Sequence, residues 1–124
     1  MSKEYYELTY IINPVLEDDQ YSEIIQNFTD LIKDNDGEID EVDEWGIRKF
    51  EFEMDGKSSG YYVNAYFHAP GDLIDKLERA LRIEDNIMRY LTLKYDAKML
   101  RHRKLQKKNA VLNIFEVEES EDEE

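Results

Sequence analysis

Apolar residues follow two different spacings along this chain, and the alternation between them limits the fold more than any other feature of the sequence. From Tyr6 to Ile12 they stand at every second position, the period of a strand with one buried face. A helical spacing of three or four residues follows, carried by Tyr21, Ile24, Ile25, Phe28, Leu31 and Ile32. Asn13-Pro14 separates this predicted strand from this predicted helix, and Asp36-Gly37 ends the helix.

The second half of the chain repeats this order with one additional strand. Residues 39–54 have the pattern of a long strand whose apolar phase shifts across Gly46, as a glycine bulge requires. The turn residues from Asp55 to Gly60 join it to a strand over residues 61–69, so the two should form an antiparallel hairpin. Pro70 opens a second helix, and residues 87–95 form the fourth predicted strand.

The order β-α-β-β-α-β predicts an α+β fold of the ferredoxin-like kind. Right-handed crossovers place both helices on one face of a four-stranded antiparallel sheet and leave the other face open. If Val63 and Phe67 point to the helices, alternation sends four side chains of the same strand to the open face: Tyr62, Asn64, Tyr66 and His68. An exposed aromatic patch there indicates contact with another molecule.

We expect residues 1–95 to form the only domain, because a chain of 124 residues is too short for two ordinary ones. Residues 96–124 are a charged C-terminal extension, basic over residues 98–108, apolar over residues 110–115 and acidic over residues 116–124. The basic stretch has two interpretations, a solvated helical or extended tail and an arm that reaches phosphate. The acidic end is expected to be disordered on its own.

Composition excludes several kinds of function. The chain has no cysteine and two distant histidines, so we expect neither a metal site nor a cofactor. No segment has the length of a membrane span or the pattern of a secretory signal, which predicts a cytoplasmic protein. The net charge of −14 argues against nucleic-acid binding by the chain alone, so an RNA role needs local basic patches or a basic partner.

Motifs for catalysis are missing from the sequence. Carboxylate pairs such as Asp18 and Asp19 have no apolar pocket to raise one pKa. His68 has no serine or cysteine nucleophile nearby, and Gly56 and Gly60 lack the spacing of a phosphate-binding loop. We therefore predict that the chain is not an enzyme, has no catalytic residue and takes no small-molecule substrate.

Several segments together resemble ribosomal protein six of the bacterial small subunit, the S-six family, from about Tyr6 to Lys94. The matching segments are Tyr6-Glu7, Asn13-Pro14, Val42 to Lys49, Gly60 to Val63 and Leu81 to Arg89. The resemblance implies a non-catalytic ribosomal protein with the ferredoxin-like fold. It also implies that the chain joins ribosomal protein eighteen and binds the central domain of small-subunit ribosomal RNA.

Two sets of candidate residues come from this resemblance and from the basic extension. The candidates for RNA contact are Lys3, Arg82, Arg89, Lys98, Arg101, Arg103 and Lys104, and those for partner contact are Trp45, Arg48, Lys49, Tyr62 and Tyr66. Arg48, Lys49 and Arg89 align with basic positions of the family. Plain packing at the bulge is the alternative for Trp45, and weak surface ion pairs are the alternative for Arg82 and Arg89.

Two other functions stay open at this point. Gly60-Tyr61-Tyr62-Val63 partly matches the stacking segment of RNA-recognition domains, so a free-standing single-strand RNA binder could use Tyr62 and Tyr66 as platforms. An acylphosphatase-like hydrolase is a distant third, because Asn13-Pro14-Val15-Leu16 replaces its phosphate loop.

Overall fold

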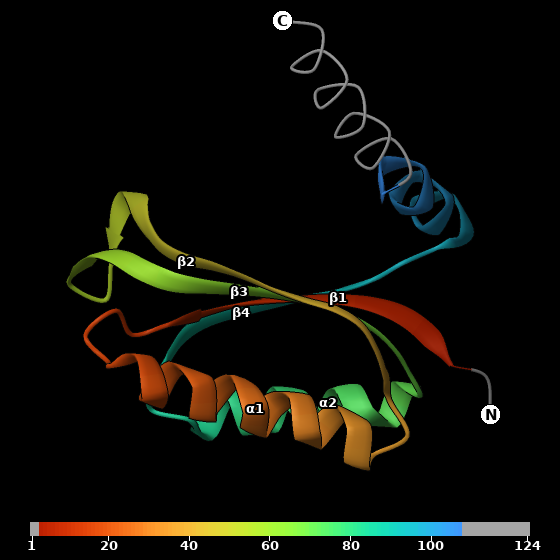
Figure 1. Ribbon diagram of the computed structural model, residues 1–124, viewed down its shortest axis with the longest axis horizontal. Helices are drawn as coiled ribbons and strands as arrows, with labels where there is room; N and C mark the ends of the chain where they lie inside the picture. Colours follow the sequence, from red (N-terminus) through yellow and green to blue (C-terminus); the bar gives the residue numbers. More distant parts are fainter. Residues whose placement is uncertain (1–2, 108–124) are drawn as a thin grey trace, which may run out of the picture. The chain divides into compact units, whose positions relative to one another are not determined.

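The computed structural model of this protein describes residues 3–107. Within them, residues 4–94 form a sheet with two helices on one face (Figure 1). The elements in order are β1 (Glu4–Ile12), α1 (Asp18–Asp34), β2 (Glu38–Met54), β3 (Lys57–Ala69), α2 (Gly71–Ile83) and β4 (Ile87–Lys94). The strands lie in the order β2-β3-β1-β4, and every neighbouring pair is antiparallel. The predicted ferredoxin-like α+β fold is confirmed.

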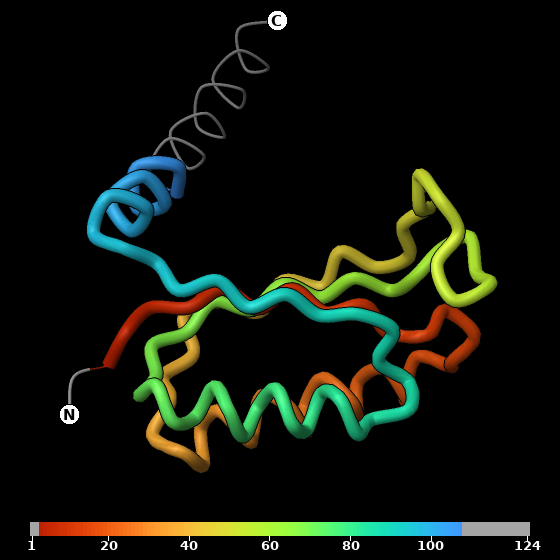
Figure 2. The backbone as a smooth tube through the Cα atoms, turned by 180° about the vertical axis from the view of Figure 1, so that it is seen from behind, coloured from red at the N-terminus to blue at the C-terminus, as the bar shows by residue number. Residues whose placement is uncertain are grey.

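The chain divides into two compact units, Met1–Lys94 and Tyr95–Glu124. In the second unit a helix covers residues 97–107, following β4 along the tube of Figure 2. The Asp96 carboxylate accepts a hydrogen bond from the Met99 amide at 2.8 Å and so caps the start of this helix. The predicted apolar run over residues 110–115 and the acidic end over residues 116–124 lie outside the described residues. Within residues 3–107, every helix is too short or too polar for a membrane crossing.

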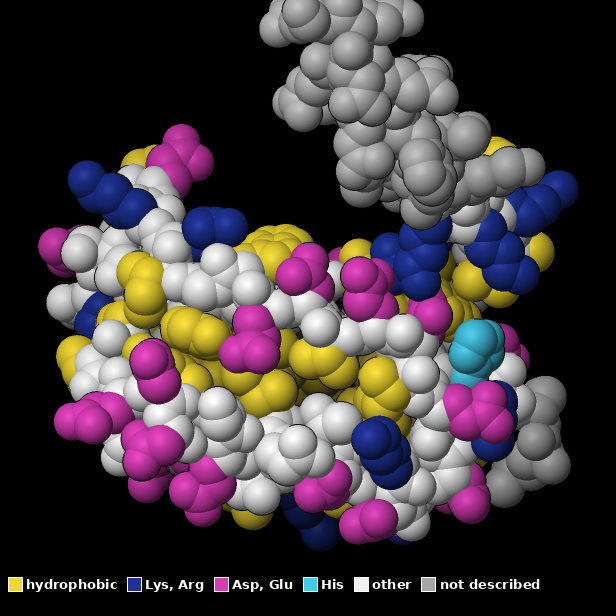
Figure 3. Space-filling model, in the orientation of Figure 1, with side chains coloured by type: hydrophobic (Ala, Val, Ile, Leu, Met, Phe, Trp, Pro, Cys, Tyr) yellow, Lys and Arg dark blue, Asp and Glu magenta, His cyan; other side chains and the backbone are white. Residues whose placement is uncertain are grey.

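The hydrophobic core lies between the sheet and the two helices, where Figure 3 shows apolar side chains gathered between the layers. The two central strands, β1 and β3, supply alternate residues, and α1 and α2 each supply one face, as the two spacings predict. The most deeply buried members are Leu8, Tyr10, Ile12, Ile32, Val63, Phe67, Leu73, Leu77 and Leu81. The opposite face of the sheet is left uncovered by α1 and α2.

Gly46 is a bulge in β2, as the sequence predicts. It has a φ of 79°, and the register between β2 and β3 shifts between Glu44 and Gly46. Because the bulge adds one residue, Trp45 and Ile47 lie on opposite faces although both positions are odd. Ile47 pairs with Tyr61 on the helix side, whereas Trp45 stacks on Tyr62 on the open side.

The turn between β2 and β3 is shorter than predicted. Asp55 and Gly56 have positive φ values of 52° and 75°, the combination found in two-residue hairpin turns. The strand β3 therefore begins at Lys57 and not at Tyr61, and residues 57–60 are part of the hairpin instead of a loop. The last strand ends at Lys94, one residue earlier than predicted.

Candidate functional site

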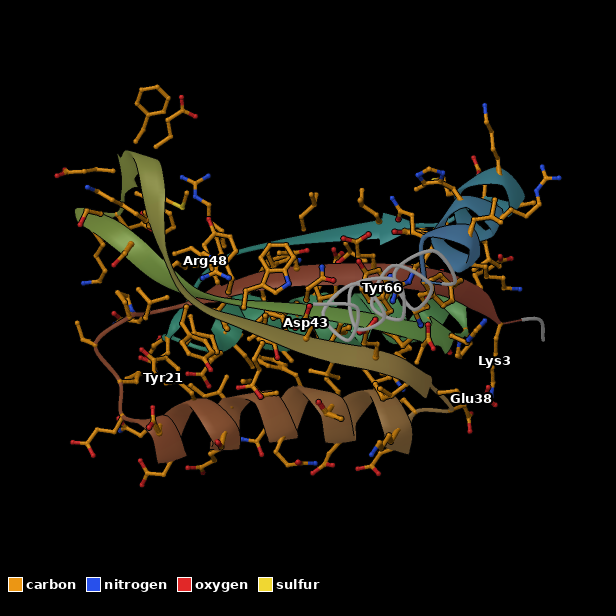
Figure 4. All side chains as sticks on the ribbon, turned by 45° about the horizontal axis from the view of Figure 1, so that its top comes forward. Lys3, Tyr21, Glu38, Asp43, Arg48 and Tyr66 are labelled. Atoms are coloured by element: carbon orange, nitrogen blue, oxygen red, sulfur yellow. The ribbon has the colours of Figure 1, made fainter. Side chains whose placement is uncertain are left out.

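The open face is the sheet surface turned away from α1 and α2, which is brought forward in Figure 4. Cross-strand pairing assigns its residues, because directly paired residues point to the same side. The residues that face this side include Tyr5, Glu7, Thr9 and Ile11 of β1, Glu38, Glu41, Asp43, Trp45, Arg48 and Phe50 of β2, Tyr62, Asn64, Tyr66 and His68 of β3, and Arg89, Leu91 and Leu93 of β4. The four β3 side chains predicted to face this way do so.

An aromatic cluster of Trp45, Phe50 and Tyr62 lies on the open face near the β2–β3 hairpin. The rings of Trp45 and Tyr62 stack with centroids 5.9 Å apart and planes inclined by 15°. The Phe50 ring meets Tyr62 edge to face at 6.2 Å. The Trp45 indole N–H donates to the Asp43 carboxylate at 3.1 Å, which fixes its orientation while 40% of the side chain stays exposed.

Phe50 and Phe52 were not among the residues predicted to contact a partner. Phe52 is 78% exposed, the largest exposed fraction among the large apolar residues of the described chain. Both follow Gly46 at even spacing, in the same phase as Arg48, which pairs with Gly60 on the open face. The phase shift across the bulge was therefore the signal that could have identified them.

Carboxylates are interleaved with the aromatic rings of the open face. The Tyr5 hydroxyl donates to the Asp40 carboxylate, and the Tyr5 ring contacts Tyr66 and His68 with centroids 6.3 and 4.8 Å away. Figure 4 shows Asp43 and Tyr66 along the middle of this face. Phosphate groups would be repelled by such a surface, whereas a cationic protein segment would be attracted to it.

Asn64 lies at the centre of the open face but is almost completely buried, with 1% of its surface exposed. Its side-chain amide donates to the Glu7 carboxylate at 3.1 Å and to the Thr9 hydroxyl at 2.7 Å. These bonds provide acceptors for both N–H groups of the side-chain amide and connect β3 to β1 through side chains. The strand phase of Asn64 alone indicated an exposed contact residue. Because its side chain is covered, Asn64 instead contributes to the shape of the face.

Arg48 and Lys49 lie on β2, which is an edge strand, as predicted. Both side chains are exposed, and Arg48 shares the open face with the aromatic cluster. An edge strand also offers backbone N–H and C=O groups that have no neighbour on one side. This part of β2 therefore combines cations, aromatic rings and backbone hydrogen-bonding groups.

Arg82 and Arg89 line one surface pocket together with Met88 and Tyr90. Arg82 lies in the last turn of α2, and its guanidinium donates to the Tyr90 hydroxyl at 3.2 Å. Arg89 is an exposed residue of β4. The pocket brings together two cations that are seven positions apart in sequence, which suits it to a phosphate group.

Lys3 is already engaged within the protein. Its ammonium lies 3.0 Å from the Glu38 carboxylate, and this hydrogen bond and charge hold the pKa of Glu38 below its usual range. The Glu38 side chain is 69% exposed and that of Lys3 35%, so solvent screens the pair and it contributes little to stability. An anion could compete with Glu38 for Lys3.

The helix over residues 97–107 carries the remaining RNA candidates. Lys98, Arg101 and Lys104 are spaced three residues apart, so they share one side of the helix, and all three are exposed. Arg103 lies on another side and is half-buried. Lys98, Arg101 and Lys104 therefore present three aligned positive charges to solvent. Among residues 3–107 there is no group of three or more His, Cys, Asp or Glu side chains placed to hold a metal ion.

Comparison with known proteins gives one consistent result. The family model described as ribosomal protein S6 matches residues 5–94. The small ribosomal subunit protein bS6 of Christiangramia forsetii is 40% identical over 91 residues, which cover 73% of this chain and 81% of that protein. The bS6 protein of Caldanaerobacter subterraneus subsp. tengcongensis is also 40% identical over 91 residues, covering 73% and 96%. The crystal structure of 30S ribosomal protein S6 from Thermotoga maritima matches with a TM-score of 0.76 at 28% identity, covering 84% of this chain and 98% of that one.

Proposed function

Because this chain belongs to the ribosomal protein S6 family, and is thus a non-enzymatic protein of the small ribosomal subunit, we propose that it binds ribosomal RNA together with a second protein. The RNA is the central domain of small-subunit ribosomal RNA, and the second protein is ribosomal protein eighteen. Membership of the family confirms the resemblance found in the sequence and the cytoplasmic ribosome as the location. It also agrees with the predicted absence of catalysis.

The observation that carries this proposal is the separation of the aromatic cluster on β2 and β3 from the arginine pair at β4, on the other edge of the sheet. Carboxylates occupy the middle of the open face, and Arg82 and Arg89 line a pocket at the β4 edge. RNA affinity depends mainly on phosphate contacts with Lys and Arg, so the two surfaces suit different partners. The aromatic cluster and the adjoining carboxylates suit a protein, and the arginine pocket suits RNA.

The protein partner is proposed to bind the aromatic cluster and the adjoining edge of β2. The contacting residues are Trp45, Arg48, Lys49, Tyr62 and Tyr66, to which the structure adds the exposed Phe52. Large aromatic side chains are typical binding hot spots when a partner covers them. The carboxylates of Glu41 and Asp43 would meet cations of the partner, as a basic ribosomal protein provides.

RNA is proposed to contact Lys3, Arg82 and Arg89 in the domain over residues 1–95. Lys98, Arg101, Arg103 and Lys104 would add contacts from the charged extension over residues 96–124. A net charge of −14 weakens RNA binding by the chain alone. A basic partner reduces this field, so binding of the two proteins to RNA should be cooperative.

A free-standing single-strand RNA binder is the alternative, with bases stacked on Tyr62 and Tyr66. Carboxylates beside these rings oppose it, because each base brings a phosphate with it.

Fluorescence of Trp45 tests the partner surface directly, because it is the only tryptophan of the chain. Titration with ribosomal protein eighteen should shift its emission to shorter wavelength as the indole is covered. An unchanged spectrum on saturation, with binding established by sedimentation, would remove the aromatic cluster from the proposed interface.

A further inference from the structure

The basic helix, defined as residues 97–107, is followed closely in sequence by a segment of opposite charge. Its five Lys and Arg residues are accompanied by no Asp or Glu. Residues 116–124 contain seven Asp and Glu and no Lys or Arg. Both segments lie in the charged C-terminal extension over residues 96–124.

We propose that residues 116–124 bind the basic helix in the free protein and compete there with RNA phosphate. This inference rests on the proposed function, because it concerns the cations that are proposed to reach RNA. The occupant is the chain's own acidic segment, and the site on the helix is the exposed side formed by Lys98, Arg101 and Lys104.

Geometry permits this contact. A helix of eleven residues is about 16 Å long at 1.5 Å per residue. Residues 109–115 connect the opposite charges through seven uncharged residues without proline, and they span up to about 24 Å when extended. The connection is therefore long enough to turn back along the whole basic side of the helix.

Opposite charge attracts the acidic segment to the basic helix, and the short connection raises the effective concentration of that segment at the helix. Seven carboxylates face a helix side with three aligned cations, in a chain whose other segments carry an excess of acids. Each exposed ion pair is weak and screened by salt. A connection of only seven residues, however, gives an effective concentration of the order of millimolar, comparable with the dissociation constant of a weak ionic contact. The helix is then occupied for a large fraction of the time.

The consequence is a selective RNA contact. A ligand that meets only the basic helix must displace the acidic segment, so its apparent affinity falls by roughly three- to tenfold. RNA already held by a partner protein and by Arg82 and Arg89 pays the same cost, but from a much tighter complex. At a given protein concentration the tighter complex therefore stays occupied, whereas the weaker complex with isolated RNA of unrelated sequence dissociates.

The first test needs no RNA. Nuclear magnetic resonance of the full chain is compared with a variant in which all seven acids of residues 116–124 are replaced by Gln or Asn. We expect the amide signals of residues 98–107 to move between the two proteins at low salt and to converge at high salt. Identical spectra of the helix at low salt overturn the proposal, whatever the RNA affinity of the protein is.

The second test uses a single-stranded oligonucleotide of unrelated sequence as the probe. The neutralised variant should bind it roughly three- to tenfold more tightly than the full chain. A matched pair separates local competition from net charge: E118Q/E119Q/E121Q in the acidic segment against E23Q/D75N/E78Q on the helices of the domain. Equal gains in the two triple variants contradict competition at the helix. If neither protein binds the oligonucleotide while the helix signals still move, the proposed RNA role of the helix fails and the intramolecular contact stands.

Discussion

The indole of Trp45 lies nearly parallel to the ring of Tyr62, with centroids 5.9 Å apart, and donates a hydrogen bond to Asp43. This places an amphipathic aromatic surface beside a carboxylate on an edge of the sheet. The stack is part of the folded chain, so little further ordering is needed when a partner covers it. Partner binding should therefore depend strongly on these two rings.

Trp45→Ala should weaken binding of ribosomal protein eighteen by at least tenfold, measured by calorimetric titration. Hot-spot aromatic residues typically contribute about 2 kcal/mol or more. Tyr62→Phe keeps the stacked ring and should change the affinity by less than about threefold. Ile83→Ala, which removes a still more exposed apolar side chain from α2, serves as the control. Equal losses for Trp45→Ala and Ile83→Ala would contradict the assigned surface.

Arg89→Ala and Arg82→Ala should each lower RNA affinity in the presence of the partner and reduce its salt dependence. Loss of one phosphate contact lowers the slope of log affinity against log salt by about 0.7 to 0.9. Filter binding over a range of salt concentrations measures this slope. Lys33→Ala removes an exposed cation from the last turn of α1 and should leave the slope unchanged. A weaker affinity with an unchanged slope would mean that the arginines act through the fold and not through phosphate.

Gly60→Ala should destabilise the protein and distort the aromatic cluster. A Cβ at this position would contact Ile11 and approach Phe50 Cζ to 2.8 Å, so the hairpin must move. Overpacking of this kind costs about 1 to 3 kcal/mol, or roughly 4 to 24 °C in the unfolding midpoint of a domain of this size. Ser59→Ala, on the adjoining residue, is the control. An unchanged midpoint for Gly60→Ala would show that the hairpin does not hold Phe50 against the sheet.

Stability should fall as pH rises above about 10, because two tyrosines keep their protons to a higher pH in the folded protein than in the unfolded chain. Burial, and then the hydrogen bond from its hydroxyl to Glu44 at 2.9 Å, raise the pKa of Tyr61 to about 12. Burial also raises the pKa of Tyr10. A group whose pKa is raised on folding makes its full contribution to stability at pH values below its unfolded pKa. That contribution is lost as the pH rises towards the folded pKa.

Urea unfolding between pH 9 and 12 measures this decline. Tyr61→Phe removes one of the two groups, so its stability should depend less steeply on pH than that of the unchanged protein. The same dependence in both proteins would mean that Tyr61 does not contribute.

The sequence was sufficient for the fold because the spacing of buried residues is local. Alternation in β1 and β3 and the helical spacing of α1 and α2 each report one buried face, and together they fix the element order. The start of β3 was missed because Asp55-Gly56 alone makes the turn, so the polar residues after it pair as a strand. Turn residues indicate where a chain can reverse but not how many of them are used.

The site was less predictable because it depends on contacts between strands. Alternation placed Tyr62 and Tyr66 on the open face, but it could not show that Asn64 is covered there by its bonds to Glu7 and Thr9. Nor could it show that the hairpin brings Phe50 against Tyr62. The phase shift across Gly46 was predicted, but the sequence did not show that Phe52 is left 78% exposed.

Cooperative RNA binding is the central claim and can be measured directly. Labelled central-domain ribosomal RNA is titrated with this protein at near-physiological salt, with and without ribosomal protein eighteen. We predict weak binding by the chain alone and a stable complex when the partner is present. Equally tight binding without the partner would contradict the account, and loss of that binding in a Tyr62→Ala/Tyr66→Ala variant would establish the open face as an RNA-stacking platform instead.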